Sequence, residues 1–257
     1  MKKLMTPLLV AGALVLAAGC GGSEETGAPV AADSKVVALT QGEFAGKVQA
    51  ALAAKKTFQV VTTTTDTDGP ATFTTNVRLA GASADVQGSA LESTFVRVGG
   101  TLYGKGGQLS SDPKKPWVKY DPTGKGTGKE ATAILAGAML QLLGAQLDQY
   151  RMAVAASPYA TDFKSEAGQP VDGVATTKYT MTVNVLKATQ AKAFGQYLTS
   201  ESAAQSNLTE LPIEVTVDAE SLPRTFAYEA DGAKVSGTFG KFGEPVTITA
   251  PAATEIA

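Results

Sequence analysis

The chain contains no histidine and only one cysteine among its 257 residues. The absence of histidine removes the commonest general base, the commonest metal ligand, and the Ser/His and Cys/His forms of nucleophilic catalysis. One cysteine cannot form an internal disulfide or a cysteine-based zinc site. We therefore expect a protein that is not an enzyme, with no catalytic residues, no cofactor and no metal, whose fold is stabilised by packing alone.

Concentrated positive charge is also missing. The chain has 22 Lys and Arg against 24 Asp and Glu, a net charge of −2, and no basic run. Nucleic-acid binding normally requires a basic patch or stripe, so nucleic acid is not an expected partner. Asp66, Asp68 and Asp85 lack the loop spacing of a calcium site. A pair of distant carboxylates of the glycosidase type stays open, because such pairs assemble only in the folded chain.

The N-terminal apolar run, residues 8–16, is too short for a retained membrane anchor. It is about half of the roughly 20 residues that a spanning helix needs. The run follows Lys2 and Lys3 and precedes three small residues and Cys20. This pattern is typical of a bacterial lipoprotein export signal, in which the cysteine becomes the first mature residue and accepts diacylglycerol. The alternative is an ordinary secretory signal with an incidental cysteine.

We divide the chain accordingly. Residues 1–19 are predicted to be a signal peptide, 20–35 a lipidated flexible tether, 36–251 one folded domain and 252–257 a disordered tail. The tether is rich in Gly, Ser, Glu and Ala, which favours a hydrated coil. Acyl chains contribute about 0.8 kcal/mol per buried methylene, so acylation would hold the domain on a membrane. We expect an exported protein, anchored at the outer face of the cytoplasmic membrane.

Within the domain, residue patterns favour strands with a few helices. Thr40 and Glu43 have the spacing of a capping box and predict a helix at 41–54. Apolar residues then alternate with polar ones, which indicates strands with one buried face. The predicted strands are 57–66, 73–79, 84–88, 94–98, 101–103, 117–120, 162–166, 175–185 and four more, centred on Ile213 to Val217, Phe226 to Tyr228, Val235 to Phe239 and Val246 to Ile248.

Two further helices are predicted at 129–156 and 187–202. The first presents a broad apolar face made of Ile134, Leu135, Met139, Leu142, Leu143 and Leu147. A sheet with one apolar face must cover it, and these helices are the sequence material suited to that task. The predicted fold class is α+β, a large curved antiparallel sheet (half-barrel) whose apolar concave face is covered by helices.

Several segments, taken in order, resemble the LppX/LprG-type family of actinobacterial envelope lipoproteins, whose fold is similar to that of the LolA/LolB lipoprotein carriers. The family often places a tryptophan on the strand after Leu211-Pro212, where this chain has Ile213-Glu214-Val215. The matching features are Cys20, the opening helix with its Thr-rich strand, residues 99–103 leading to Trp117, Gly173 before the Tyr179 strand, residues 211–215, 222–223 and 241–246.

The resemblance implies a hydrophobic cavity for acyl chains, with no catalysis. It implies a protein that binds and carries or displays acylated lipids or glycolipids, with an envelope lipid transporter as a candidate partner and a monomeric state. The alternative is a protein-interaction or sensory module on the same fold without lipid cargo. The candidate cavity-lining residues, each of which could equally be core, are Phe58, Val60, Phe73, Val77, Ile134, Leu135, Met139, Leu142, Leu143, Leu147, Tyr179, Met181 and Val183.

Aromatic residues near the middle of the chain have two interpretations. Trp117, Tyr103 and Tyr120 could mark a cavity mouth or a membrane-facing rim, since amphipathic rings are favoured there. Ordinary strand packing is the simpler alternative. Lys114 and Lys115 could meet anionic headgroups or could simply be solvated.

Overall fold

The computed structural model describes residues 38–257 except for 82, 91–92, 107–108, 121–148, 195–197 and 231. The predicted signal peptide, the tether with Cys20 and most of the predicted 129–156 helix lie outside these residues. Within the described ranges, no helix combines the length and the apolar character needed to cross a bilayer.

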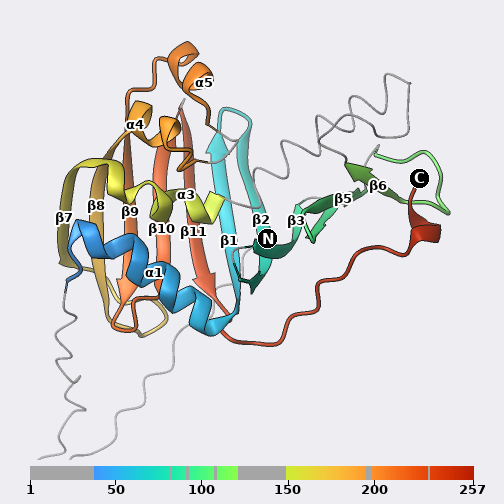
Figure 1. Ribbon diagram of the computed structural model, residues 1–257, viewed down its shortest axis with the longest axis horizontal. Helices are drawn as coiled ribbons and strands as arrows, with labels where there is room; N and C mark the ends of the chain where they lie inside the picture. The colour runs from blue at the N-terminus through green and yellow to red at the C-terminus, as the bar shows by residue number, and fades with distance from the viewer. Residues whose placement is uncertain are drawn as a thin grey trace, which may run out of the picture. The chain divides into compact units, whose positions relative to one another are not determined.

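The described chain builds one open antiparallel sheet of eleven strands in the order β6-β5-β4-β3-β2-β1-β11-β10-β9-β8-β7 (Figure 1). Neighbouring strands are consecutive in the sequence except at the centre, where the first strand pairs with the last. The strands are β1 (Thr57–Asp66), β2 (Gly69–Ala80), β3 (Ser83–Ala90), β4 (Ser93–Val98), β5 (Thr101–Lys105), β6 (Trp117–Tyr120), β7 (Ala160–Ala167), β8 (Thr176–Asn184), β9 (Glu210–Asp218), β10 (Pro223–Ala230) and β11 (Ala233–Gly240).

The strand register places the large apolar side chains on one face, which we call the inner face. Val60 of β1 lies opposite Phe239 of β11, and Phe226 of β10 lies opposite Val215 of β9. Val215 in turn lies opposite Tyr179 of β8. All five are buried in the main core. Because side chains alternate along a strand, the polar residues between them form the outer face.

Helix α1 (Gln41–Lys55) crosses the inner face from β7 to β1 (Figure 1). Its N-terminus has the predicted capping box: the Glu43 carboxylate accepts hydrogen bonds from the backbone N–H and the hydroxyl of Thr40, at 3.1 and 2.6 Å. Phe44, Val48 and Leu52 recur at helical spacing and are buried against the sheet. Helix α3 (Gln149–Ala155) and the 3-10 turn η1 (Ser157–Tyr159) follow on the same side, and α3 contacts β9 and β10. The predicted fold class is confirmed.

The helix predicted at 187–202 is wrong. The structure has two short helices, α4 (Val185–Gln190) and α5 (Ser200–Gln205). Lys192 adopts a left-handed φ of 57°, and the N–H groups of Lys192 and Ala193 donate to the carbonyls of Thr189 and Ala188. These paired bonds form the motif that commonly ends helices, but glycine normally occupies the left-handed position. Because this position is a lysine, the sequence carries no signal that the helix ends before it.

The last predicted strand, around Val246 and Ile248, is also wrong. The residues after β11 form an irregular segment, although Ile248 is buried and its carbonyl accepts a hydrogen bond from Arg78 at 2.9 Å. Both edges of β11 are already occupied, by β10 and by β1. A further strand therefore has no free edge of β11 to pair with. The alternation of apolar residues at 246–248 reflects the burial of Ile248 and not strand pairing.

The chain's last residues also differ from the predicted disordered tail. They form a 3-10 turn, η2 (Ala253–Glu255), and Ile256 bridges in parallel to Trp117 at the β6 edge. The N–H of Ala257 donates to the carbonyl of Trp117 at 2.8 Å. Backbone hydrogen bonds that the composition of the tail does not signal therefore hold it in place.

Candidate ligand-binding face

The structure places the described candidate lining residues on the inner face. Phe73 is only half-buried there, and Cys20 and the six candidates at 134–147 lie outside the described residues. Six candidates are almost fully buried: Phe58, Val60, Val77, Tyr179, Met181 and Val183. Whether any of them lines a cavity stays a prediction.

At the β7–β8 end, the inner face is filled by α1. The Phe44 ring lies 4.8 Å from the Tyr179 ring and 5.6 Å from the Phe163 ring, measured between centroids. The Tyr179 hydroxyl accepts a hydrogen bond from the N–H of Leu39 at 2.8 Å, and burial raises its pKa. Such ring contacts add to the hydrophobic burial of each side chain. This part is helix-on-sheet core.

Towards the other edge, the inner face continues across β2 to β5 and is mainly apolar, although Arg97 of β4 lies opposite both Val86 and Leu102. Val77, Val86, Phe95 and Leu102 lie on successive strands and are at most 7% exposed. Phe95 and Leu102 were not among the candidate lining residues. In the run 94–98, Phe95 and Val96 are both apolar, so alternation alone does not say which of them faces inward.

Three hydroxyl groups interrupt this apolar surface near its centre. Thr64 of β1 and Tyr228 of β10 both lie opposite Val235 of β11. The two hydroxyl-bearing residues therefore share one row of the inner face with Val235. The Thr64 hydroxyl is buried and has no hydrogen-bond partner. Burial raises the pKa of the Tyr228 hydroxyl above its usual range, so it stays protonated and can donate. The third hydroxyl belongs to Thr62, which lies two residues before Thr64 on the same face of β1 and is 3% exposed.

The described residues gather no metal site, because nowhere among them do three or more Cys, Asp or Glu side chains converge. Their best-formed ion pair is structural: Asp218, 4% exposed, accepts from both Nε and Nη2 of Arg224 and from the N–H groups of Glu220 and Leu222. These bonds fix the turn between β9 and β10. The arrangement offers apolar burial with a few hydroxyl donors, which suits binding.

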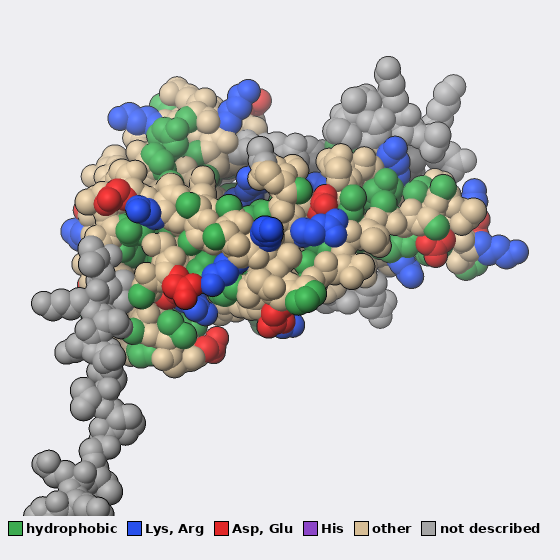
Figure 2. Space-filling view, turned by 60° about the horizontal axis from the view of Figure 1, so that its bottom comes forward, with side chains coloured by type: hydrophobic (Ala, Val, Ile, Leu, Met, Phe, Trp, Pro, Cys, Tyr) green, Lys and Arg blue, Asp and Glu red, His purple; other side chains and the backbone are tan. Residues whose placement is uncertain are grey.

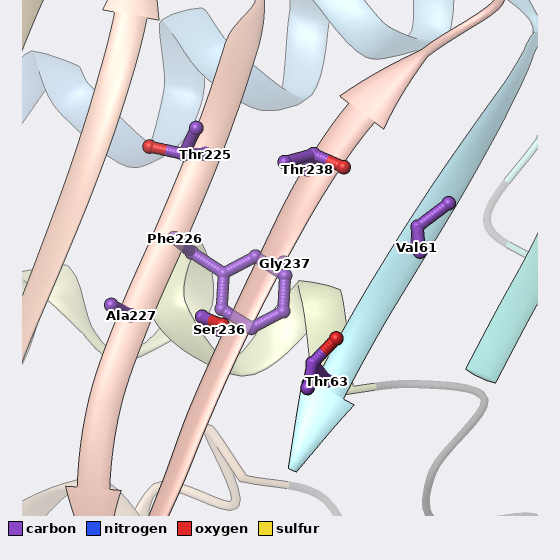
Figure 3. Close-up of a pocket in the computed structure, with 8 residues that line it drawn as sticks. All are labelled: Val61, Thr63, Thr225, Phe226, Ala227, Ser236, Gly237 and Thr238. Atoms are coloured by element: carbon purple, nitrogen blue, oxygen red, sulfur yellow. The ribbon is translucent and has the colours of Figure 1, made fainter. Parts of the chain in front are cut away.

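Two open depressions of about 270 Å³ each lie elsewhere on the sheet. One is on the outer face of β1, β10 and β11 and is lined mainly by small side chains, including Thr63, Thr225 and Ser236 (Figure 3). The other lies between the start of β1 and residues 241–247 and includes Phe58. Neither is the predicted cavity between sheet and helices.

An open eleven-stranded antiparallel sheet with helices on one face is the fold of the LppX/LprG-type lipoproteins that the sequence resembles. The structure is similar to that of LprF from Mycobacterium bovis, with a TM-score of 0.50 and 19% identity over 82% of this chain and 98% of LprF. For LppX from Mycobacterium tuberculosis the TM-score is 0.49 and the identity 15%, over 82% of this chain and 100% of LppX.

A more remote likeness is to the MucA/MucB complex of Pseudomonas aeruginosa, with a TM-score of 0.37 and 14% identity over 82% of this chain and 59% of that one. No protein-family model matches the sequence, and no curated protein does. At these identities the similarity to LprF establishes the fold and leaves the ligand to be argued from the residues.

Proposed function

We propose that this protein is a membrane-anchored envelope lipoprotein that binds acylated lipids or glycolipids against its inner face and carries or displays them without catalysis. The observation that supports this most is the apolar inner face at β2 to β5, formed by Val77, Val86, Phe95 and Leu102. The sequence supplies a matching apolar surface in the predicted helix around Ile134 to Leu147, and the acyl chains would lie between the two.

Binding would proceed by burial alone. Each Å² of apolar ligand surface removed from water contributes about 25 cal/mol, so each methylene contributes about 0.8 kcal/mol. The hydroxyl of Thr64 would donate to an ester or amide carbonyl of the ligand, because an unpartnered buried donor is costly until it finds an acceptor. The Tyr228 hydroxyl, which burial keeps protonated, would offer a second donor in the same row. An acylated lipid combines these two features, and a pure hydrocarbon has only the first.

Cys20 would hold this domain at the outer face of the cytoplasmic membrane through its acyl chains, with the tether at 20–35 allowing it to reorient. Replacing it tests the anchor separately from the cargo. We expect Cys20→Ala to move the protein from the membrane fraction to the soluble fraction. The protein that is released should still contain lipid, because the inner face is unchanged. A Cys20→Ala protein that stays with the membrane would contradict lipidation as the anchor.

The second candidate function is a protein-interaction or sensory module in which the inner face is completely filled. The packing of Phe44 against Phe163 and Tyr179 favours this second function at one end of the sheet. The two functions differ in what lies against β2 to β5. An acyl chain can be displaced by a larger side chain, whereas fixed core side chains cannot.

Val86→Phe separates the two functions, with Val61→Phe on the outer face as the control. If lipid lies against Val86, the larger ring displaces it: native mass spectrometry of the full chain from its own host should show less bound lipid at nearly unchanged thermal stability. If the face is filled core, overpacking destabilises by about 1–3 kcal/mol and no lipid is found in either variant. That second result would refute the lipid-binding function.

A further inference from the structure

The outer face of the β5–β6 hairpin alternates aromatic rings with lysines. Tyr103 lies opposite Lys119, and Lys105 lies opposite Trp117. Strand alternation puts all four on the face opposite to the buried Leu102. The Lys105 ammonium lies 5.9 Å from the Trp117 ring centroid, within range of a cation–π interaction. The pairs therefore form one compact patch, which we call the aromatic–lysine patch.

The loop that enters β6 adds two more lysines. Its shape is fixed by its own hydrogen bonds: the N–H of Lys114 donates to the Asp112 carboxylate at 2.9 Å, and the Ser110 hydroxyl donates to the carbonyl of Lys115 at 2.7 Å. The side chains of Lys114 and Lys115 are exposed. Among the described residues, none of the ion pairs found involves these two lysines, Lys105 or Lys119.

This end of the sheet is positive although the protein as a whole is negative. Residues 101–120 contain four lysines and one aspartate, while the whole chain has a net charge of −2. The nearby C-terminal turn contributes one further side-chain carboxylate, that of Glu255, which accepts from the N–H of Ala252. Several blue side chains lie at the end of the molecule that carries β5 and β6, with fewer red ones among them (Figure 2). The local excess of positive charge fits an anionic surface.

We propose that the aromatic–lysine patch, with Lys114 and Lys115, docks on the anionic headgroups of the membrane that the protein is anchored to. Tryptophan and tyrosine rings favour the bilayer interface, because one end of each ring is apolar and the other is polar. Lysines near an anionic bilayer each strengthen partitioning about fivefold. Four lysines with two rings give a reversible contact at headgroup depth, because the patch has no large aliphatic residue for deeper insertion.

Docking would set the orientation that the tether leaves free. β5 and β6 carry the patch on their outer face, and they end the apolar inner face that contains Phe95 and Leu102. With the patch on the headgroups, that edge of the sheet lies next to the bilayer. The proposal rests on the membrane anchor of the proposed function but not on its cargo, and it holds whether or not lipid binds the inner face.

The chain contains a single tryptophan, Trp117, so its fluorescence reports on this patch in the unmodified full chain. We expect its emission to shift to the blue, and to be quenched by lipids brominated near the headgroup, with vesicles of mixed phosphatidylglycerol and phosphatidylcholine. Vesicles of phosphatidylcholine alone should have no such effect. High salt should reverse the shift, because it screens exposed charges.

The double variant Lys114→Gln, Lys115→Gln should weaken this partitioning about 25-fold, from two lysines at fivefold each. The matched control is Lys187→Gln, Lys192→Gln, which removes the same charge from the α4 region and should leave the shift intact. Equal effects of the two pairs would overturn the proposal, as would an equal shift with neutral vesicles. A shift produced by soluble polyglutamate and by neither vesicle would assign the patch to an acidic polymer instead.

Discussion

Gly237 of β11 provides the space that the Phe226 ring occupies on the inner face. A Cβ at position 237 would lie 2.5 Å from Cζ of Phe226, about 1 Å closer than the ~3.5–4.0 Å at which carbon atoms normally touch. The ring is 1% exposed and cannot move freely, because it packs edge-on against Phe239 at 5.8 Å and stacks with Tyr228 at 6.3 Å between centroids. Figure 3 shows the ring beside Gly237.

We therefore expect Gly237→Ala to destabilise the fold by about 1–3 kcal/mol, the usual range for overpacking. A loss of about 2 kcal/mol would lower the unfolding midpoint by roughly 4–8 °C in a domain of this size. Thermal and urea unfolding of the full chain, followed by circular dichroism, measure it. The sign is informative, because an unconstrained glycine in a strand is less stable than alanine by roughly 0.5–1 kcal/mol.

Gly240→Ala is the matched control in the same strand. An added Cβ at Gly240 meets no atom within 4 Å, so the substitution should be neutral or stabilising by up to about 1 kcal/mol. Phe226→Leu removes the clash and should make Gly237→Ala less costly in the double variant than alone. If both alanine variants have equal stability, or if Phe226→Leu leaves the cost unchanged, the ring does not constrain Gly237 and the reasoning is refuted.

Three further predictions concern single polar groups. Thr64→Val should raise the free energy of urea unfolding of the lipid-free protein by about 1 kcal/mol, because it removes an unpartnered buried hydroxyl. Unchanged or lower stability would mean that the hydroxyl has a hydrogen-bond partner. Asp218→Ala should lower the free energy of unfolding by about 3–5 kcal/mol, because it leaves the half-buried Arg224 guanidinium without its partner. Glu220→Ala, which breaks an exposed ion pair with Lys55, should lower it by under about 1 kcal/mol. Similar losses in the two variants would contradict this ranking. Hydrogen bonding from Arg78 lowers the pKa of the Asp85 carboxyl in the folded protein. The ionised carboxylate therefore contributes stability that is fully present above the pKa of Asp in the unfolded chain, about 3.9, and that is lost as pH falls through the lowered pKa of the folded state. Asp85→Asn should flatten the loss of stability in acid titrations, and an unchanged acid limb would exclude Asp85 as a source.

The predicted site could be assigned to a face from the sequence, but not to a cavity. The alternation of Phe58 with Val60, and of Tyr179 with Met181 and Val183, correctly put these residues on one buried face. Alternation gives the same signal for a core residue and for a ligand-lining residue, because both avoid water. The filled β7–β8 end became visible only with Phe44 in place, more than a hundred residues away along the chain.

Local patterns failed where the decisive partner was distant or the residue type was unusual. Val246 and Ile248 alternate like a strand, but β11 has no free edge for them. Lys192 ends α4 in a backbone conformation that glycine usually adopts. The tail beyond Pro251 is held by backbone hydrogen bonds to Trp117 and by no side-chain pattern.

The sequence by itself determined the capped first helix, most of the strands and their inward faces, because capping and alternation act over a few residues. It also limited the chemistry, through the missing histidine and the single cysteine. Only the tertiary structure decided that β1 pairs with β11, from the opposite end of the domain's sequence, at the centre of the open sheet. The tertiary structure also decided that α1 fills one end of the inner face. It likewise brought Tyr103, Lys105, Trp117 and Lys119 into one patch. Pairing over such distances depends on the burial that the whole sheet achieves, and no local pattern encodes that sum.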